Sequence, residues 1–270
     1  MVACRSRDDR SGLHDEIPAG NMIPAVRLVS ALVTLNASPF GPGEELVFQV
    51  KTLGVKNGTA QFNVGAPEQV EGLAAWPIVM VARSTGLTDA VFPVRDRFVT
   101  FWDPVSELPV EGRLTASEGG KKRSMSMRFH RQTTQGAAHA DVMVVDAKET
   151  TTFSREMEPD AQDVQSAVYW LRTRPLRVGE RDSVPIVAGK RQWTMEAEVM
   201  AQAPLETPAG RFEAVRVEIS TAFAGKLQSR KAIEAYFSAD ARHLPLRFDA
   251  DLLLGKMTAE LVHFEVGESL

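Results

Sequence analysis

The stretch DVQSAVYWLRTRPLRVGE, residues 163–180, is the segment whose apolar residues recur most clearly at helical spacing. We expect a helix over about 160–173, because Pro159 and Asp160 suit a helix start and Pro175 cannot continue one. One face of this helix carries an apolar stripe, made of Ala161, Val164, Val168 and Leu171. This stripe should pack against a sheet, with Arg172 and Arg174 outside it.

On both sides of this helix, apolar and polar residues alternate. In the segment Ser124–His130, Met125, Met127 and Phe129 share one face and the polar residues share the other. The same alternation recurs at 193–199, 215–219 and 244–252. A period of two is typical of strands with one face in a core and the other in water.

Turn signals separate these strands at short intervals. Asn57-Gly58 is the strongest, and it predicts a two-residue hairpin turn with positive φ at both positions. Short hairpins in series make an antiparallel meander. We therefore expect a mainly β fold, in which the meander forms a strongly curved sheet or open barrel with one central helix.

This reading also predicts the domain organisation. Residues 1–20 are a polar linker, and residues 21–270 form a single β-rich domain of two meander halves, about 44–148 and 183–266, joined by the helix. Two separate subdomains are the alternative. We prefer one continuous sheet, because a meander that curls leaves less exposed edge.

Composition and motifs exclude several functions. Hydrophobic residues make up 44% of the 270 and the net charge is −4, which is ordinary for a globular protein and argues against a nucleic-acid partner. The sequence contains no phosphate-binding loop, no Gly-x-Ser-x-Gly elbow and no His-Glu-x-x-His motif. We predict no catalytic residue, no cofactor and no metal site.

Two patterns near the N-terminus point to export. Met1-Val2-Ala3-Cys4 is similar to a bacterial lipobox, and the polar residues that follow suit a tether, so we predict that Cys4 is lipidated. The alternative is an incidental cysteine. Residues 22–35 imitate a short signal peptide, although an apolar segment that packs onto the domain explains them better.

Three groups of residues are candidates for a site. His130 and His139 flank a turn near Asp141, but exposed strand histidines are the default interpretation. Asp249 and Asp251 share one strand face, most simply a wet one. The best candidates for holding a ligand's anionic group or sugar lie on the helix, namely Tyr169, Trp170, Arg172 and Arg174.

The order of motifs resembles that of a bacterial exported family, the domain of unknown function 3108 family, over roughly residues 43–266. The resemblance rests on the helix segment, on Gly43–Val50, on Thr207–Ala214 and on the segments 235–240 and 243–246. Phe48 and Phe237 stand where we expect Tyr or Trp. The resemblance implies export but brings no catalytic residue.

Two functions follow as expectations. The first is a lipoprotein on the periplasmic side of the envelope, anchored to the outer membrane, that binds or transports a lipid, glycolipid or polysaccharide without catalysis. Ten methionines and thirteen phenylalanines suit an adaptable apolar lining, and they suit a plain core equally well. The second is an envelope scaffold that binds partner proteins through a sheet edge.

Overall fold

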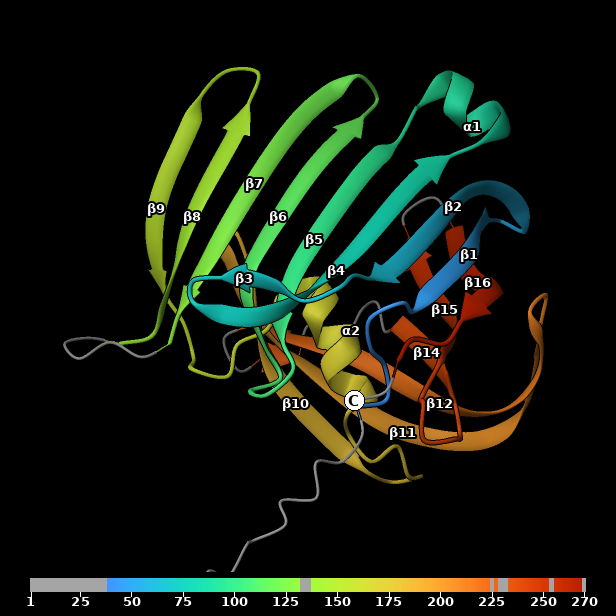
Figure 1. Ribbon diagram of the computed structural model, residues 1–270. Coiled ribbons are helices and arrows are strands. Elements are labelled where there is room, and N and C mark those ends of the chain that lie inside the picture. The colour runs from blue at the N-terminus through green and yellow to red at the C-terminus, as the bar shows by residue number, and fades with distance from the viewer. Residues whose placement is uncertain (1–37, 132–136, 224–225, 228–232, 253–254, 269–270) are drawn as a thin grey trace, which may run out of the picture. The chain divides into compact units, whose positions relative to one another are not determined.

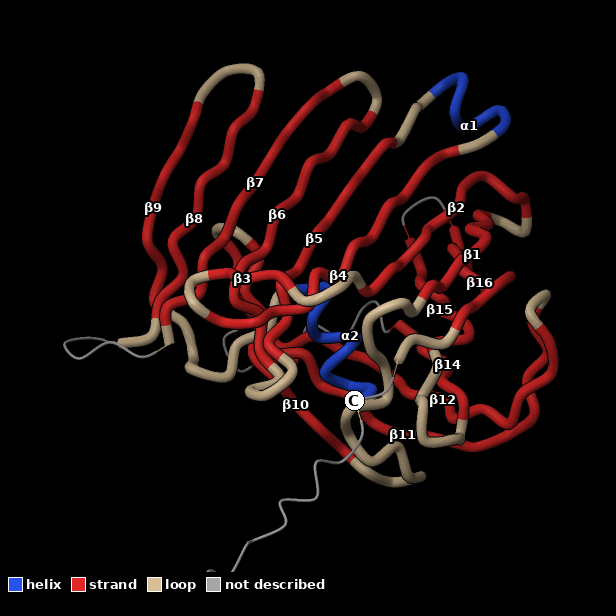
Figure 2. The backbone as a smooth tube through the Cα atoms, viewed as in Figure 1, coloured by secondary structure: helices blue, strands red, loops and turns tan. Residues whose placement is uncertain are grey.

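The computed structural model describes residues 38–131, 137–223, 226–227, 233–252 and 255–268. Residues 37–270 form one compact unit. Most of its described part is strand, with two short helices, as Figures 1 and 2 show. Neither described helix is long and apolar enough to cross a bilayer.

The elements before the central helix are β1 (Glu45–Thr52), β2 (Val55–Val64), β3 (Glu68–Val70), β4 (Leu73–Ser84), α1 (Gly86–Val91), β5 (Arg95–Asp103), β6 (Leu108–Glu118), β7 (Lys121–His130), β8 (His139–Asp146) and β9 (Thr150–Glu156). The central helix is α2 (Val164–Arg172). After it come β10 (Arg181–Ala188), β11 (Arg191–Thr207), β12 (Gly210–Phe223), β13 (Lys226–Leu227), β14 (Ile233–Ser238), β15 (Pro245–Leu252) and β16 (Gly255–Glu265). β9 therefore lies beyond residue 148, where we expected the first half to end.

The strands form one antiparallel sheet in the order β10-β11-β12-β14-β15-β16-β1-β2-β4-β5-β6-β7-β8-β9, with β3 on β4 and β13 on β12. The first strand pairs with the last, from Glu45 opposite Glu265 to Thr52 opposite Met257. This pairing joins the two meander halves in the middle of the sheet. The expectation of one curved, open meander with a central helix is confirmed.

The two ends of the sheet share a core. Val187 of β10 packs in the same buried cluster as Phe129 of β7 and Val142 of β8. Arg155 of β9 donates from Nη1 to the carbonyl of Lys190, 2.5 Å away, in the β10–β11 turn. The sheet therefore bends far enough to bring β9 close to the β10–β11 hairpin, although these strands do not pair.

The central helix begins later than expected. Asp163 is its N-cap, since its side chain accepts from the backbone of Ser166 while the Ser166 hydroxyl accepts from the backbone of Asp163. The expected start at Asp160 is wrong, because Pro159 and Asp160 lie in a turn that the hydrogen bond from the Ala161 N–H to the Glu158 carbonyl closes. Gln162 forms a parallel bridge to Ile186 and so occupies part of the edge of β10.

The expected turn at Asn57-Gly58 is also wrong. The turn lies at Leu53-Gly54, whose φ angles are 51° and 78°, between the paired residues Thr52 and Val55. Asn57 is the extra residue of a β-bulge inside β2. Gly58 lets β4 approach closely there, since an added Cβ would lie 3.0 Å from the carbonyl oxygen of Arg83.

Candidate functional site

The predicted ligand residues on α2 lie against the protein's own side chains. Tyr169 is buried, and its ring centroid lies 4.7 Å from that of Phe40. Burial raises the pKa of its phenol, and the hydroxyl has no hydrogen-bond partner within the described residues. Trp170 is half-buried between two core clusters.

Arg172 is the residue whose position differs most from expectation. We expected it outside the buried stripe, yet it is 1% exposed. Its Nη1 and Nη2 each lie 2.7 Å from a different carboxylate oxygen of Glu44, just before β1. The guanidinium carbon also lies 4.9 Å from the centroid of Phe40. A bidentate partner and an aromatic face make this burial tolerable for a cation.

Arg174 is the remaining member of the predicted group. Its guanidinium carbon lies 5.1 Å from the Trp170 ring centroid, and it forms an ion pair with Glu107. The four residues thus hold the end of the helix in place. Their ligand role stays a prediction, and Cys4 lies outside the described residues.

A row of apolar side chains on the face of the sheet that carries α2 is exposed enough to meet a ligand. An apolar row crosses six neighbouring strands, with one residue from each strand directly opposite the next. It runs through Phe62, Met80, Phe98, Leu114, Met125 and Val144. Directly paired residues project from the same face of a sheet, so these six side chains form one continuous strip.

This apolar row lies on the face that carries α2. Two residues along β5 from Phe98, Thr100 donates from its hydroxyl to the Asp163 carboxylate, 2.8 Å away, at the start of α2. That neighbouring position is fully buried, whereas the apolar row is covered only in part. Phe98 is 9% exposed and the other five members are half-buried.

The β10–β11 turn approaches the row at one point. An added Cβ on Gly189 would lie 3.0 Å from the sulfur of Met125, and its φ of 57° belongs to the turn. On the other side, the next row contains the small residues Ala60, Ala82 and Ala116 and the charged residues Asp96, Arg123 and Asp146. The three alanines leave Phe62, Met80 and Leu114 uncovered from this direction.

The alternation in Ser124–His130 could have indicated Met125, but the row itself was missed. Its members come from strands far apart in the sequence, and a shift of one residue in any pairing would move a member to the other face. The registers of the five strand pairs bring these residues together, and the sequence alone does not specify those registers.

Comparison with known proteins gives the family. A family model described as "Protein of unknown function (DUF3108)" matches residues 47–262. The chain belongs to this family. The resemblance based on the helix, the opening strand and the closing turn is thereby confirmed. No curated protein matches the DUF3108 chain in sequence.

Among solved structures, the DUF3108 chain is similar to a β-barrel-like protein of domain of unknown function DUF1849 from Brucella abortus. The TM-score is 0.57 at 10% identity, covering 85% of this chain and 99% of that one. At this identity the likeness shows the fold alone. Two proteins described as exported and as a lipoprotein, from Bacteroides fragilis and Parabacteroides distasonis, match at 11% identity over 85% of the chain, with TM-scores of 0.33 and 0.30.

Proposed function

We propose that this protein is a non-catalytic lipoprotein of the bacterial cell envelope that binds the acyl chains of a lipid or glycolipid. The observation that carries the proposal is the half-buried apolar row of Phe62, Met80, Phe98, Leu114, Met125 and Val144. A strip of this kind gains free energy when a second apolar surface removes it from water.

The dimensions of the row suit an acyl chain. Six neighbouring strands span five spacings of about 4.8 Å, or about 24 Å. One leaflet contributes about half of a hydrocarbon core of roughly 30 Å, so a chain taken from a membrane fits along the row. Arg123, in the next row, is exposed and stands where a polar head group would meet the protein.

The residue types support the same occupant. Met80 and Met125 are unbranched and polarisable, so they adapt to chains of different length and saturation. A polysaccharide segment would instead require convergent hydrogen-bonding groups, and the row supplies apolar atoms. We therefore narrow the ligand class to molecules that carry acyl chains.

Native mass spectrometry of the protein purified from its own envelope tests the proposal. The wild-type protein should carry a bound lipid, and Met125→Gln should lose most of it, because an amide facing an acyl chain is left without a hydrogen-bond partner. Bound mass is the direct readout, with circular dichroism as a check on folding.

Met143→Gln is the matched control. Met143 lies one position from Val144 on β8, on the opposite face of the sheet, and is 44% exposed. Its substitution should leave the bound lipid unchanged. A wild-type protein that elutes without lipid, or equal retention by the two variants, would contradict the proposal.

A scaffold that adds a partner strand to a sheet edge is the second candidate. It is favoured by β9, which stands at the end of the sheet with β8 as its neighbour and begins Thr150-Thr151-Thr152. Thr152→Lys should weaken such pairing, because edge lysines oppose strand addition, and it should spare lipid binding.

A further inference from the structure

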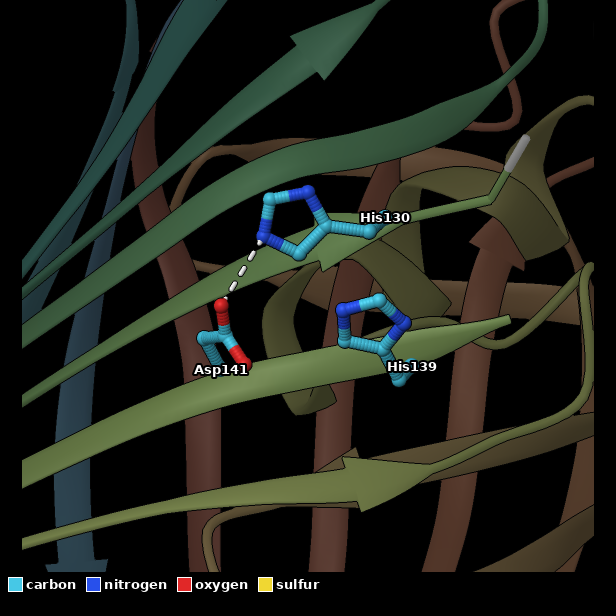
Figure 3. Close-up of side chains that lie close together, drawn as sticks. All are labelled: His130, His139 and Asp141. Atoms are coloured by element: carbon cyan, nitrogen blue, oxygen red, sulfur yellow. Dashed lines mark ion pairs between the residues drawn. The ribbon is translucent and has the colours of Figure 1, made fainter. Parts of the chain in front are cut away.

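On the face of the sheet opposite the apolar row, two histidines and an aspartate meet at the end of the β7–β8 hairpin. His130 ends β7 and His139 begins β8, and the two are directly paired. Their rings are stacked, with centroids 4.8 Å apart and planes 26° apart. Figure 3 shows the rings side by side, with Asp141 next to them.

Asp141 joins the pair because it follows His139 by two residues, which places both side chains on one face of β8. Its Oδ2 lies 3.3 Å from Nε2 of His130. One ligand atom from each of the three residues lies within 4.8 Å of the others. Contrary to the sequence-based expectation of no metal site, we propose that His130, His139 and Asp141 form a site for a divalent transition metal, with Zn²⁺ as its simplest occupant.

The distances allow this with small movements of the side chains. Zinc bonds to nitrogen and oxygen ligands at about 2.0–2.2 Å, so two ligand atoms on a tetrahedral ion lie about 3.4 Å apart. A contraction from 4.8 Å is within reach of χ rotations, because His130 and Asp141 are 38% and 55% exposed. Core packing does not hold these side chains in their present rotamers.

A second contact helps to select the binding atom of His139. Its Nδ1 lies 3.3 Å from the carbonyl oxygen of Ala137. Donation from Nδ1 to this carbonyl leaves the lone pair on Nε2, and metal-bound histidines usually hold their other ring nitrogen in this way. Two imidazoles and one carboxylate favour zinc or copper over calcium or magnesium, which prefer oxygen ligands alone.

The neighbouring charges leave room for a cation. Arg128 is paired with Asp141 in the β7–β8 register, but its Nε lies 4.0 Å from Glu111 of β6 and 3.9 Å from Glu71. Its charge is therefore drawn toward these carboxylates. On the other side, Glu156 of β9 stands opposite His139 and is exposed, so a carboxylate or a water molecule can complete the coordination.

Asp141 also lines a shallow depression of about 560 Å³ on this face, together with Ser126, Arg128, Thr152 and Ser154. The carboxylate of the site is therefore open to solvent, and an ion can reach it without any rearrangement of the strands.

Isothermal titration of the full chain, without a polyhistidine tag, with zinc chloride tests the site. The wild-type protein should show a saturable zinc site that His139→Gln and Asp141→Asn each weaken about tenfold or more, at least as much as the loss of an outer-shell partner costs. Zinc should also raise the melting temperature of the wild type, and much less that of the His139→Gln variant.

His263→Gln is the control, since His263 is another exposed strand histidine whose Nε2 lies 3.7 Å from Glu265. This variant should bind zinc like the wild type. Absence of zinc binding by the wild type, or equal affinities of the His139→Gln and His263→Gln variants, would overturn the proposal. A second zinc site elsewhere, such as one at His14, would persist in the His139→Gln variant and so be told apart.

Discussion

At the scale of single residues, the buried charged side chains determine which substitutions destabilise the protein most. Arg172 and Glu44 are 0% and 3% exposed in their side chains and are joined by two hydrogen bonds. A buried pair of this kind contributes little net stability compared with apolar replacements. Removal of one partner is costly, because it leaves the other charge buried without compensation.

We expect Glu44→Gln to lower the free energy of unfolding by about 3–5 kcal/mol. Adding Arg172→Met should recover part of that loss, since the uncompensated charge is then absent. Urea denaturation of the two single variants and the double variant forms the thermodynamic cycle. Glu107→Gln, at the partly exposed Arg174 pair, should cost under about 1 kcal/mol. A cost at Glu44 as small as that at Glu107 would contradict this account.

Asp249 makes the free energy of unfolding depend on pH. Burial raises the pKa of its carboxyl, but hydrogen bonds from Arg247, Thr258 and Lys256 outweigh this, and the net shift is downward. A carboxyl with a lowered pKa in the folded state stabilises the protein above its ordinary pKa of about 4. That stability is lost as the pH falls through the lower, folded-state pKa.

We therefore expect Asp249→Asn to destabilise the protein by about 1–3 kcal/mol at pH 7, through the donors that it leaves unsatisfied. The difference from wild type should shrink as the pH is lowered below about 4. Unfolding by urea at a series of pH values measures this. Asp251→Asn is the control, because Asp251 is exposed on the same strand. A difference that grows toward acid pH would refute the argument.

At the scale of elements, α2 is held by a wider surface than a single apolar stripe. Leu171 is 1% exposed, as expected, while Val168 is only half-buried. Val164 is 51% exposed, contrary to the expected stripe. It is the first residue after the Asp163 cap, where the helix has just left the edge of β10.

Leu171→Ala should lower the free energy of unfolding by about 2–5 kcal/mol, the range for a buried leucine. Val164→Ala should change it by within about 0.5 kcal/mol, as is usual for an exposed site. Both follow from denaturant midpoints measured under the same conditions. Similar costs for the two variants would mean that the helix packs through its expected stripe after all.

At the scale of the whole molecule, the pairing of β1 with β16 makes the fold depend on its entire length. These strands lie more than 200 residues apart in sequence. The ion pair between Lys51 of β1 and Glu260 of β16, 2.6 Å long, links them. Contacts of such separation make folding slow, because a long loop must close before they form.

The lipid anchor also belongs to this scale. Cys4→Ala in the full-length gene product should move the protein from the membrane fraction to the soluble one, since each buried methylene of an acyl chain contributes about 0.8 kcal/mol. Cell fractionation measures the membrane association, and the mass of the intact protein shows whether Cys4 carries a lipid. A wild-type protein with no lipid mass that fractionates as soluble would refute it.

The sequence by itself determined the local structure and the family. Alternation in Ser124–His130 and similar segments requires half-buried strands, and the spacing of Val168 and Leu171 requires a helix. These are properties of near neighbours in the chain, so no tertiary information is needed. The facing of His130 and His139 across one hairpin was predictable for the same reason.

The tertiary structure alone decided which residues share a face across strands and which charges are buried. Nothing local distinguishes Arg172 from Arg174, yet the first meets Glu44 from 128 residues away and the second stays near the surface. The apolar row likewise depends on five separate strand registers. The turn lies at Leu53-Gly54, because Gly58 is instead paired within the sheet, with Val50 of β1 and Ser84 of β4.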